Sequence, residues 1–212
     1  MASPLKNNRR IVYHIGHGVP LKKIGLAEEK ITWLKYINRY LRTRMFTHVL
    51  AYSQKFSAVL EEAFNNKRVK FVYFGQPRND ELANSKDIAV NEIIKIYPKV
   101  VGAKELILYA PTWRNYAETI FFPFSELDPT SLNDVLIKKS AFLFLREHPF
   151  YPSIIPPEVL KQSNILLFNS ESFPEIMDYL SVFDRLITDY SSIYLDFIGL
   201  GKKIAFIPYD ID

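Results

Sequence analysis

The sequence predicts an α/β protein with parallel sheets. Apolar runs of strand length alternate with segments of helical periodicity along nearly the whole chain. This alternation is typical of βα units, in which a crossover helix joins two parallel strands. The chain has 212 residues, of which 48% are hydrophobic and 24% charged, so it is long enough for one large domain or two small ones.

The first half of the chain contains three expected strands and three expected helical segments. The strands are expected at 11–15, 49–52 and 69–74. The helical segments are expected within 28–44, at 53–64 with Ser53 as N-cap, and after the polar stretch 75–80 as far as Tyr97.

The second half repeats the alternation, which places a domain boundary near 98–104 and predicts domains at 1–97 and 98–212. The loop 116–129, rich in Phe and Pro, is either a lid or a surface excursion. The expected strands are 105–110, 142–145, 165–168, 185–187 and 203–207. The expected helices are 132–139, 174–180 and 191–200.

The composition limits the chemistry of the protein. The chain has no cysteine, which excludes disulfides, thiolate catalysis and cysteine-ligated metal, and its four histidines are well separated. We therefore expect neither a metal nor a cofactor. No apolar run reaches about 18 residues, and the first ten residues do not resemble a secretory signal, so we expect a cytoplasmic protein.

Basic residues gather in the first 44 positions, although the net charge is only +4. Such a segment attracts nucleic acid, anionic lipid or a phosphate-rich polymer, or it is an ordinary solvated helix face. The aromatic residues sit mainly inside strand-like runs, so nucleic acid is the weakest of these partners. The basic residues are Lys6, Arg9, Arg10, Lys22, Lys23, Lys30, Lys35, Arg39, Arg42 and Arg44.

Polar side chains follow three expected strands of the second half, at the point where each strand ends. Because ligands of open parallel sheets bind beyond the carboxyl ends of the strands, these side chains are expected to share one site, suited to a diphosphate. Singly, each has a structural alternative, such as an ion pair for either arginine. The residues are Thr112, Arg114, Arg146, His148, Thr188, Ser191 and Ser192.

The segment 188–192 carries the strongest phosphate signal, because an apolar strand ends there and two serines open a helix. The first turn of a helix has amides without intrahelical partners and a partial positive charge, so it attracts anions. Ser191 and Ser192 either donate to a ligand oxygen or only cap the helix.

His17 lies between Gly16 and Gly18 just after the first expected strand. Tightly turned, exposed backbone does not force this ring into a core, and an imidazole that titrates near neutrality suits a general base. An incidental loop histidine is the alternative.

Six motifs, in this order, resemble those of the CDP-glycerol glycerophosphotransferase family, bacterial enzymes that polymerise wall teichoic acid and related capsular chains. The match covers nearly the whole chain. The motifs are His17-Gly18-x-Pro20-Leu21-Lys22, Gly75-x-Pro77-Arg78-Asn79-Asp80, Tyr109-Ala110-Pro111-Thr112-Trp113-Arg114, Arg146-x-His148-Pro149, Thr188-Asp189-Tyr190-Ser191-Ser192 with Asp196-Phe197, and Pro208-Tyr209-Asp210.

The resemblance implies a glycosyltransferase-B-like fold with two Rossmann-like domains, the first on the acceptor side and the second binding the nucleotide. It implies that His17 deprotonates the acceptor hydroxyl, which attacks the β-phosphorus of CDP-glycerol and expels CMP. The acceptor would be a lipid-linked polyol-phosphate or glycan chain. The enzyme would then work peripherally at the inner face of the cell membrane.

The resemblance also assigns roles to the residues of the second half. His148 would stabilise the diphosphate charge with support from Arg114 and Arg146. Asp196 would reach the ribose or brace its loop. The remaining substrate-binding residues implied by the resemblance are Lys22, Thr112, Thr188, Ser191 and Ser192.

The chain departs from the family pattern in two ways. Gly16 stands where the family usually has a tryptophan, and relatives continue beyond both ends of this chain, so we expect both domains to be truncated. Three alternatives stay open: a donor with ribitol in place of glycerol, a truncated non-catalytic module that binds a cytidine nucleotide and an anionic surface, and a basic nucleic-acid binder.

Overall fold

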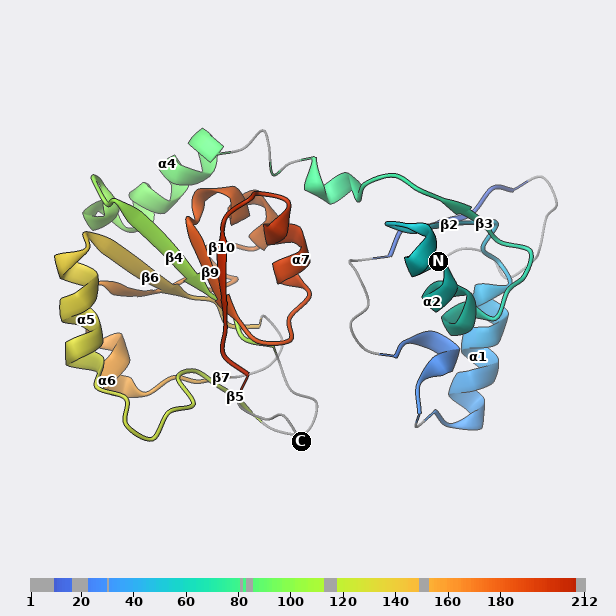
Figure 1. Ribbon diagram of the computed structural model, residues 1–212, viewed down its shortest axis with the longest axis horizontal. Coiled ribbons are helices and arrows are strands. Elements are labelled where there is room, and N and C mark those ends of the chain that lie inside the picture. Colours follow the sequence, from blue (N-terminus) through green and yellow to red (C-terminus); the bar gives the residue numbers. More distant parts are fainter. Residues whose placement is uncertain are drawn as a thin grey trace. The chain divides into compact units, whose positions relative to one another are not determined.

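The computed structural model of the protein (Figure 1) describes residues 10–16, 23–29, 31–80, 82, 86–112, 118–148 and 153–208. The chain forms two compact units, Met1–Pro77 and Arg78–Asp212. The division falls before the expected boundary after residue 97, because helix α4 (Lys86–Ile96) buries Ala89 and Ile93 in the core of the second unit. No helix of the described residues is long and apolar enough to cross a bilayer.

The first unit has a three-stranded parallel sheet in the order β1-β2-β3. The Ser53 side chain accepts a hydrogen bond from the amide of Phe56, which confirms the predicted N-cap. The ring of His14 stacks on Phe46, so this histidine belongs to an aromatic cluster. The elements are β1 (Tyr13–His14), η1 (Gly25–Ala27), α1 (Trp33–Thr43), β2 (His48–Leu50), α2 (Gln54–Phe64) and β3 (Lys70–Val72).

The second unit has a five-stranded parallel sheet in the order β10-β9-β4-β6-β8, which confirms the α/β class with parallel sheets. Its main strands are β4 (Glu105–Tyr109), β6 (Ala141–Leu145), β8 (Ile165–Leu167), β9 (Arg185–Thr188) and β10 (Lys203–Phe206). Its helices, besides α4, are η3 (Pro98–Val100), α5 (Pro129–Lys138), α6 (Pro157–Leu160), η4 (Ile176–Asp178), η5 (Leu180–Val182) and α7 (Ile193–Ile198), and the short helix η2 (Pro77–Asn79) begins at the last residue of the first unit.

Strand β6 is buried along its whole length, because helices cover both faces of the sheet (Figure 1). Phe142 and Phe144 face the cluster that contains α4 residues, whereas Leu143 and Leu145 face the cluster that contains Leu136 of α5. A strand covered on both sides needs apolar residues at every position, which explains its unbroken apolar sequence.

The loop 116–129 is neither a free lid nor a surface excursion in its described part. Strand β5 (Thr119–Ile120) pairs with β7 (Ser153–Ile154) in a separate two-stranded parallel sheet. Phe121 is fully buried and Phe122 nearly so, and both pack edge-to-face against Tyr109. The aromatic residues therefore complete one of the two cores.

The predicted helix 174–180 is replaced by the short 3-10 helices η4 and η5. The Arg146 guanidinium donates hydrogen bonds to the carbonyl oxygens of Phe173 and Pro174. The Glu175 carboxylate accepts a hydrogen bond from the amide of Met177. These side-chain bonds compete with the backbone bonds of a regular helix, as local side-chain bonds generally do.

Candidate functional site

The carboxyl ends of three neighbouring strands lie level with one another. The amide of Ala110, just after β4, donates to the carbonyl of Ile187 in β9 at 2.9 Å, and the amide of Arg146, just after β6, donates to Tyr109 at 2.9 Å. Strand β4 lies between β6 and β9, so the chain order reverses beside β4. Such a switch point leaves a crevice beyond the strand ends, where ligands of open α/β sheets bind.

A cavity of about 320 Å³ occupies this edge of the second unit. This volume is within the range of small-molecule sites. Its lining includes six residues predicted from the sequence, brought together from three segments of the chain: Thr112, Arg146, His148, Ser191, Ser192 and Asp196.

The buried Asp189 fixes Thr112 in the wall of the cavity. One oxygen of its carboxylate, Oδ1, accepts from the amide and the hydroxyl of Thr112 and from the amide of Tyr190. Asp189 is 4% exposed and does not itself line the cavity. It therefore joins the loop after β4 to the loop between β9 and α7.

Arg146 is 8% exposed, and its guanidinium donates to three backbone carbonyls, those of Phe168, Phe173 and Pro174. Burial lowers the pKa of Arg146, and the charge of Glu175 opposes this effect. An arginine remains protonated in proteins, so a positive charge stands in the cavity wall. Its bonds show that Arg146 also shapes the loop that carries Glu175.

His148 lines the same cavity and is partly buried. Burial lowers the pKa of its imidazole below the ordinary value, and the positive charge of Arg146 lowers it further. Both effects favour the neutral imidazole, which can donate one hydrogen bond to an anionic ligand from its protonated nitrogen.

Ser191 and Ser192 face the cavity at the start of α7. Ser192 occupies the N-cap position, but its side chain makes no capping hydrogen bond there. The simpler interpretation of this serine as a helix cap is therefore not supported. Both side chains are intermediate in exposure, which suits contact with a ligand.

Thr188 does not line the cavity, in contrast to the expectation. It is fully buried, and its hydroxyl donates to the carbonyl of Ala110 at 2.7 Å. As the last residue of β9, paired with Phe206 of β10, it lies inside the sheet rather than beyond it. Its hydroxyl ties β9 to the end of β4.

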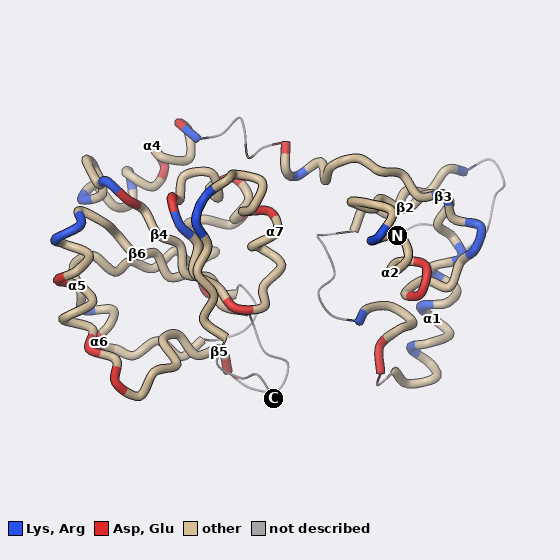
Figure 2. The backbone as a smooth tube through the Cα atoms, viewed as in Figure 1, with Lys and Arg blue, Asp and Glu red and all other residues tan. Residues whose placement is uncertain are grey.

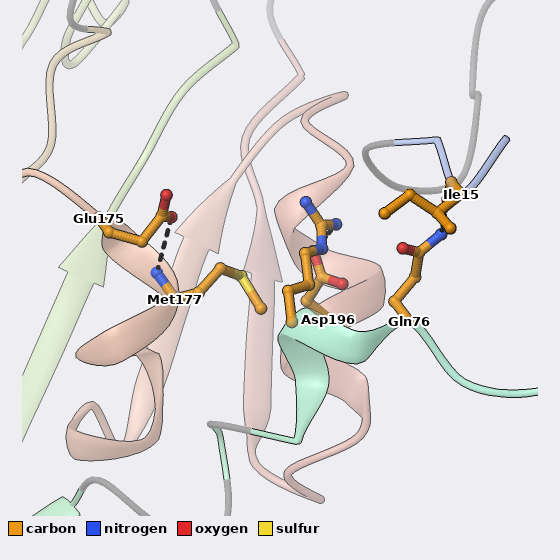
Figure 3. A network of polar contacts seen from close by, with 6 residues as sticks. Ile15, Gln76, Glu175, Met177 and Asp196 are labelled. Carbon is orange, nitrogen blue, oxygen red and sulfur yellow. Dashed lines mark hydrogen bonds and ion pairs between the residues drawn. The ribbon is translucent and has the colours of Figure 1, made fainter. Parts of the chain in front are cut away.

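Asp196 lines the cavity, and its carboxylate is paired with an arginine. Its Oδ2 accepts from Nη2 of Arg78 at 2.7 Å, and its side chain is 5% exposed. Burial raises the pKa of Asp196, while Arg78 and Asn79 act in the opposite direction. Figure 3 shows Asp196 on α7 and, on another segment of the same unit, Glu175 with its hydrogen bond to Met177.

Nine residues that line the cavity were not among the predicted site residues, and they include Arg78, Glu147, Glu175 and Met177. Arg78 and Glu147 stand inside motifs that the sequence had singled out, so their positions were marked although their roles were not. Glu175 and Met177 belong to a segment predicted as a helix, and nothing in its sequence indicated that these residues would line a site.

Three predicted site residues, His17, Lys22 and Arg114, lie outside the described residues. Within the described ranges, no three His, Cys, Asp or Glu side chains are close enough together to hold a metal ion. The described lining combines hydroxyls, an imidazole and guanidinium groups with the carboxyl groups of Glu147, Glu175 and Asp196.

Comparison with known proteins identifies relatives of this chain. It is 30% identical over 207 residues to the teichoic acid poly(glycerol phosphate) polymerase of Bacillus spizizenii. The aligned region covers 92% of this chain and 51% of that protein. It is 32% identical over 171 residues to the teichoic acid poly(ribitol-phosphate) polymerase of the same organism, which covers 80% of this chain and 27% of that protein. The chain thus spans about half the length, or less, of these relatives.

The fold is similar to that of a variant of the wall teichoic acid polymerase TagF soaked with CDPG. The TM-score is 0.72 at 23% identity, over 98% of this chain and 52% of that one. This likeness confirms the expected glycosyltransferase-B-like class. Residues 3–212 match the family described as CDP-glycerol:poly(glycerophosphate) glycerophosphotransferase. The chain belongs to the CDP-glycerol:poly(glycerophosphate) glycerophosphotransferase family.

Proposed function

We propose that the protein transfers glycerol phosphate from CDP-glycerol to the terminal hydroxyl of a polyol-phosphate chain and releases CMP. The observation that supports this most is the cavity at the switch point of the second unit. Thr112, His148, Ser191 and Ser192 all line this cavity, and the chain belongs to a family of glycerophosphotransferases.

In the proposed reaction, the acceptor oxygen forms a bond to the β-phosphorus, and the bond from that phosphorus to the bridging oxygen breaks. CMP carries away the electron pair and the negative charge. His17 takes the proton of the acceptor hydroxyl, an assignment that rests on the sequence motif alone. A transfer of this kind depends mainly on groups that stabilise charge on the leaving phosphate.

The second unit supplies those groups in this proposal. Ser191 and Ser192 donate hydroxyl hydrogen bonds to phosphate oxygens, and Thr112 lines the same cavity from the loop after β4. His148 donates from its neutral imidazole and gains a proton when charge accumulates on the diphosphate. Lys22 and Arg114 are proposed substrate contacts on the strength of their motifs.

Glycerol is proposed as the polyol because the family match names it. Two relatives from one organism, one named for glycerol phosphate and one for ribitol phosphate, are 30% and 32% identical to this chain. Overall identity therefore does not separate the two donors, and CDP-ribitol is the alternative that the experiment must include.

The test is to incubate the purified protein with a polyol-phosphate acceptor and either CDP-glycerol or CDP-ribitol, and to measure CMP release and donor affinity. CMP release with CDP-glycerol supports the proposal, and release with CDP-ribitol alone changes the donor. Binding of either donor without CMP release indicates a non-catalytic module. A folded protein that binds neither donor overturns the proposed site.

We further propose that helix α1 holds the protein on an anionic membrane surface at the cytoplasmic face. The residues of α1 are almost all exposed, and Thr43 alone in the helix is buried. Trp33, Leu34, Ile37 and Leu41 are 70%, 66%, 42% and 61% exposed. At 100° per residue these four side chains lie within about one third of the helix circumference.

Basic residues recur along α1 (Figure 2), and the helix contains no acidic residue. At 100° per residue, Lys35, Arg39 and Arg42 lie on the side opposite the apolar residues. Arg39 bonds to the protein itself, through the carbonyl of Gly25 and the carboxylate of Glu28. An exposed apolar stripe with lysine and arginine on the other side of the helix is the arrangement of helices that lie in the bilayer interface.

Sedimentation with phosphatidylglycerol vesicles and with phosphatidylcholine vesicles, over a series of salt concentrations, tests this docking. Binding that prefers the anionic vesicles and weakens as salt rises is expected, because screening shortens the reach of the basic residues. Equal binding to neutral vesicles, unchanged by salt, would show apolar insertion without charge recognition. No binding to either vesicle would overturn the docking.

A further inference from the structure

Arg78 stands at the first position of the second unit and lines the cavity of that unit. It belongs to the short helix η2, and its guanidinium donates to a carboxylate 118 residues away, that of Asp196 on α7. The side chain of Arg78 is 31% exposed, whereas that of Asp196 is 5% exposed. The cavity therefore has a cation at its accessible surface that is fixed by a buried anion.

The second arginine in the cavity wall has a different environment. Arg146 is 8% exposed and donates to three carbonyls of one loop. A guanidinium has five N–H donors in a rigid fork. The three hydrogen bonds to these carbonyls fix the Arg146 guanidinium within the loop. Arg146 contributes a positive charge to the cavity wall, but the orientation of its guanidinium is set by hydrogen bonds to the loop. Arg78 is more exposed than Arg146, and its guanidinium donates to the carboxylate of Asp196.

Asp196 places the Arg78 guanidinium beside the start of α7. Ser192 and Asp196 are four positions apart at the beginning of this helix, so their side chains lie on the same face of it. Both residues line the cavity, as Arg78 does. A cation bound to Asp196 therefore lies on the side of the helix where Ser192 meets the cavity.

We propose that Arg78 is a phosphate-binding residue of the donor site and that Asp196 is the residue that positions it. This inference rests on the proposed function, because it specifies how that site binds the diphosphate. The planar guanidinium suits two phosphate oxygens, and arginine is the side chain best adapted to such bidentate contacts. In this proposal the Asp196 carboxylate orients the Arg78 guanidinium and makes no contact with the ribose.

The test measures how strongly Arg78→Met and the wild-type protein bind cytidine, CMP and CDP, by calorimetry or by competition with CDP-glycerol. We expect the variant to bind CDP at least about tenfold more weakly, the range typical for loss of a charged hydrogen bond. The loss should grow from cytidine to CMP to CDP. Arg185→Met is the matched control, because Arg185 pairs with the Glu105 carboxylate in the same unit and does not line the cavity.

Two further variants separate contact from positioning. Arg78→Lys keeps the charge but not the planar fork, and we expect CDP affinity between those of the wild type and Arg78→Met. Asp196→Asn should weaken CDP binding less than Arg78→Met does, and should add no loss in the Arg78→Met background. An additional loss in the double variant would show that Asp196 contacts the ligand itself.

The outcomes distinguish this inference from the proposed function. If the wild type binds none of CDP-glycerol, CDP-ribitol and CDP, the donor site fails and the inference fails with it. If the wild type binds CDP and both Arg78→Met and Arg78→Lys bind it equally well, the site remains and the inference is overturned. An equal loss for cytidine and CDP also overturns it. If Arg78→Met does not fold, Arg78→Lys decides by the same comparison.

Discussion

The carboxylate of Asp189 accepts both the amide and the hydroxyl of Thr112, and so holds together two loops that come from different strands. Thr112 follows β4 and Asp189 follows β9, two neighbouring strands of the sheet. A buried carboxylate with several N–H and O–H donors is well stabilised as long as those donors stay in place. The relationship makes Asp189 a positioning residue for the cavity wall.

Replacing Asp189 with alanine should destabilise the protein by about 1–3 kcal/mol, because the amides of Thr112 and Tyr190 lose their carboxylate acceptor. Asp189→Asn keeps one acceptor oxygen and should lose less. Urea unfolding measures the free energies, and CDP-glycerol affinity reports on the loops. Unchanged affinity in a folded Asp189→Ala variant would contradict the positioning role.

Arg146→Met should destabilise the second unit by about 3 kcal/mol, since three carbonyls then lose a buried donor. Arg146→Lys should recover little, because an ammonium group cannot match the fork. The control Arg185→Met removes a partly exposed ion pair and should cost less than about 1 kcal/mol. Similar losses for the Arg146→Met and Arg185→Met variants would argue against the structural role of Arg146.

Donor binding should be accompanied by proton uptake at His148. Burial and Arg146 lower the pKa of the free imidazole, whereas a bound diphosphate raises it. Affinity for CDP-glycerol should therefore increase as the pH falls through the interval between the bound and free pKa values, and level off below the free value. Calorimetry in buffers of different ionisation enthalpy measures the uptake. His148→Gln should abolish the part of the uptake that this ring contributes.

The ionisation of Asp196 should give stability a measurable pH dependence. Burial raises the pKa of Asp196 in the native state, so its contribution is fully present below the unfolded pKa of about 3.9 and is lost as pH rises through the native value. Compared with the wild type, Asp196→Asn should therefore gain relative stability from acid to neutral pH in urea unfolding.

Asp128→Asn is a control of opposite sign. The Ser131 hydroxyl lowers the pKa of the Asp128 carboxylate, so the stability from Asp128 is present above its unfolded pKa and is lost as pH falls. The Asp128→Asn variant should lose relative stability from acid to neutral pH. Parallel trends for the two variants would contradict both assignments.

The apolar stripe of α1 should be required for docking on vesicles. Replacing Trp33 and Leu41 with serine should reduce partition onto phosphatidylglycerol vesicles by at least about tenfold, because two large apolar side chains no longer leave water. The control replaces Val135 and Ile137 of α5, which are 50% and 51% exposed, with serine. An equal reduction in the control would show that α1 is not the docking surface.

The order of elements was predictable because each signal is local. The unbroken apolar run of β6 and the N-cap at Ser53 depend on residues close in the sequence, and both agree with the structure. The segment 174–180 was not predictable in this way. Its conformation depends on Arg146, which precedes it by 28 positions and donates to the carbonyl of Pro174 in the segment and to that of Phe173 just before it.

The sequence by itself determined the alternation of strands and helices, and hence the edge of the sheet at which Thr112, His148 and Ser191 would meet, because parallel strands bring their carboxyl ends to one side. Only the tertiary structure decided what each side chain does there. It buried Thr188 against Ala110 and paired Asp196 with Arg78. Those choices depend on contacts between distant segments and on the cost of burying a charge, and local patterns in the sequence carry neither.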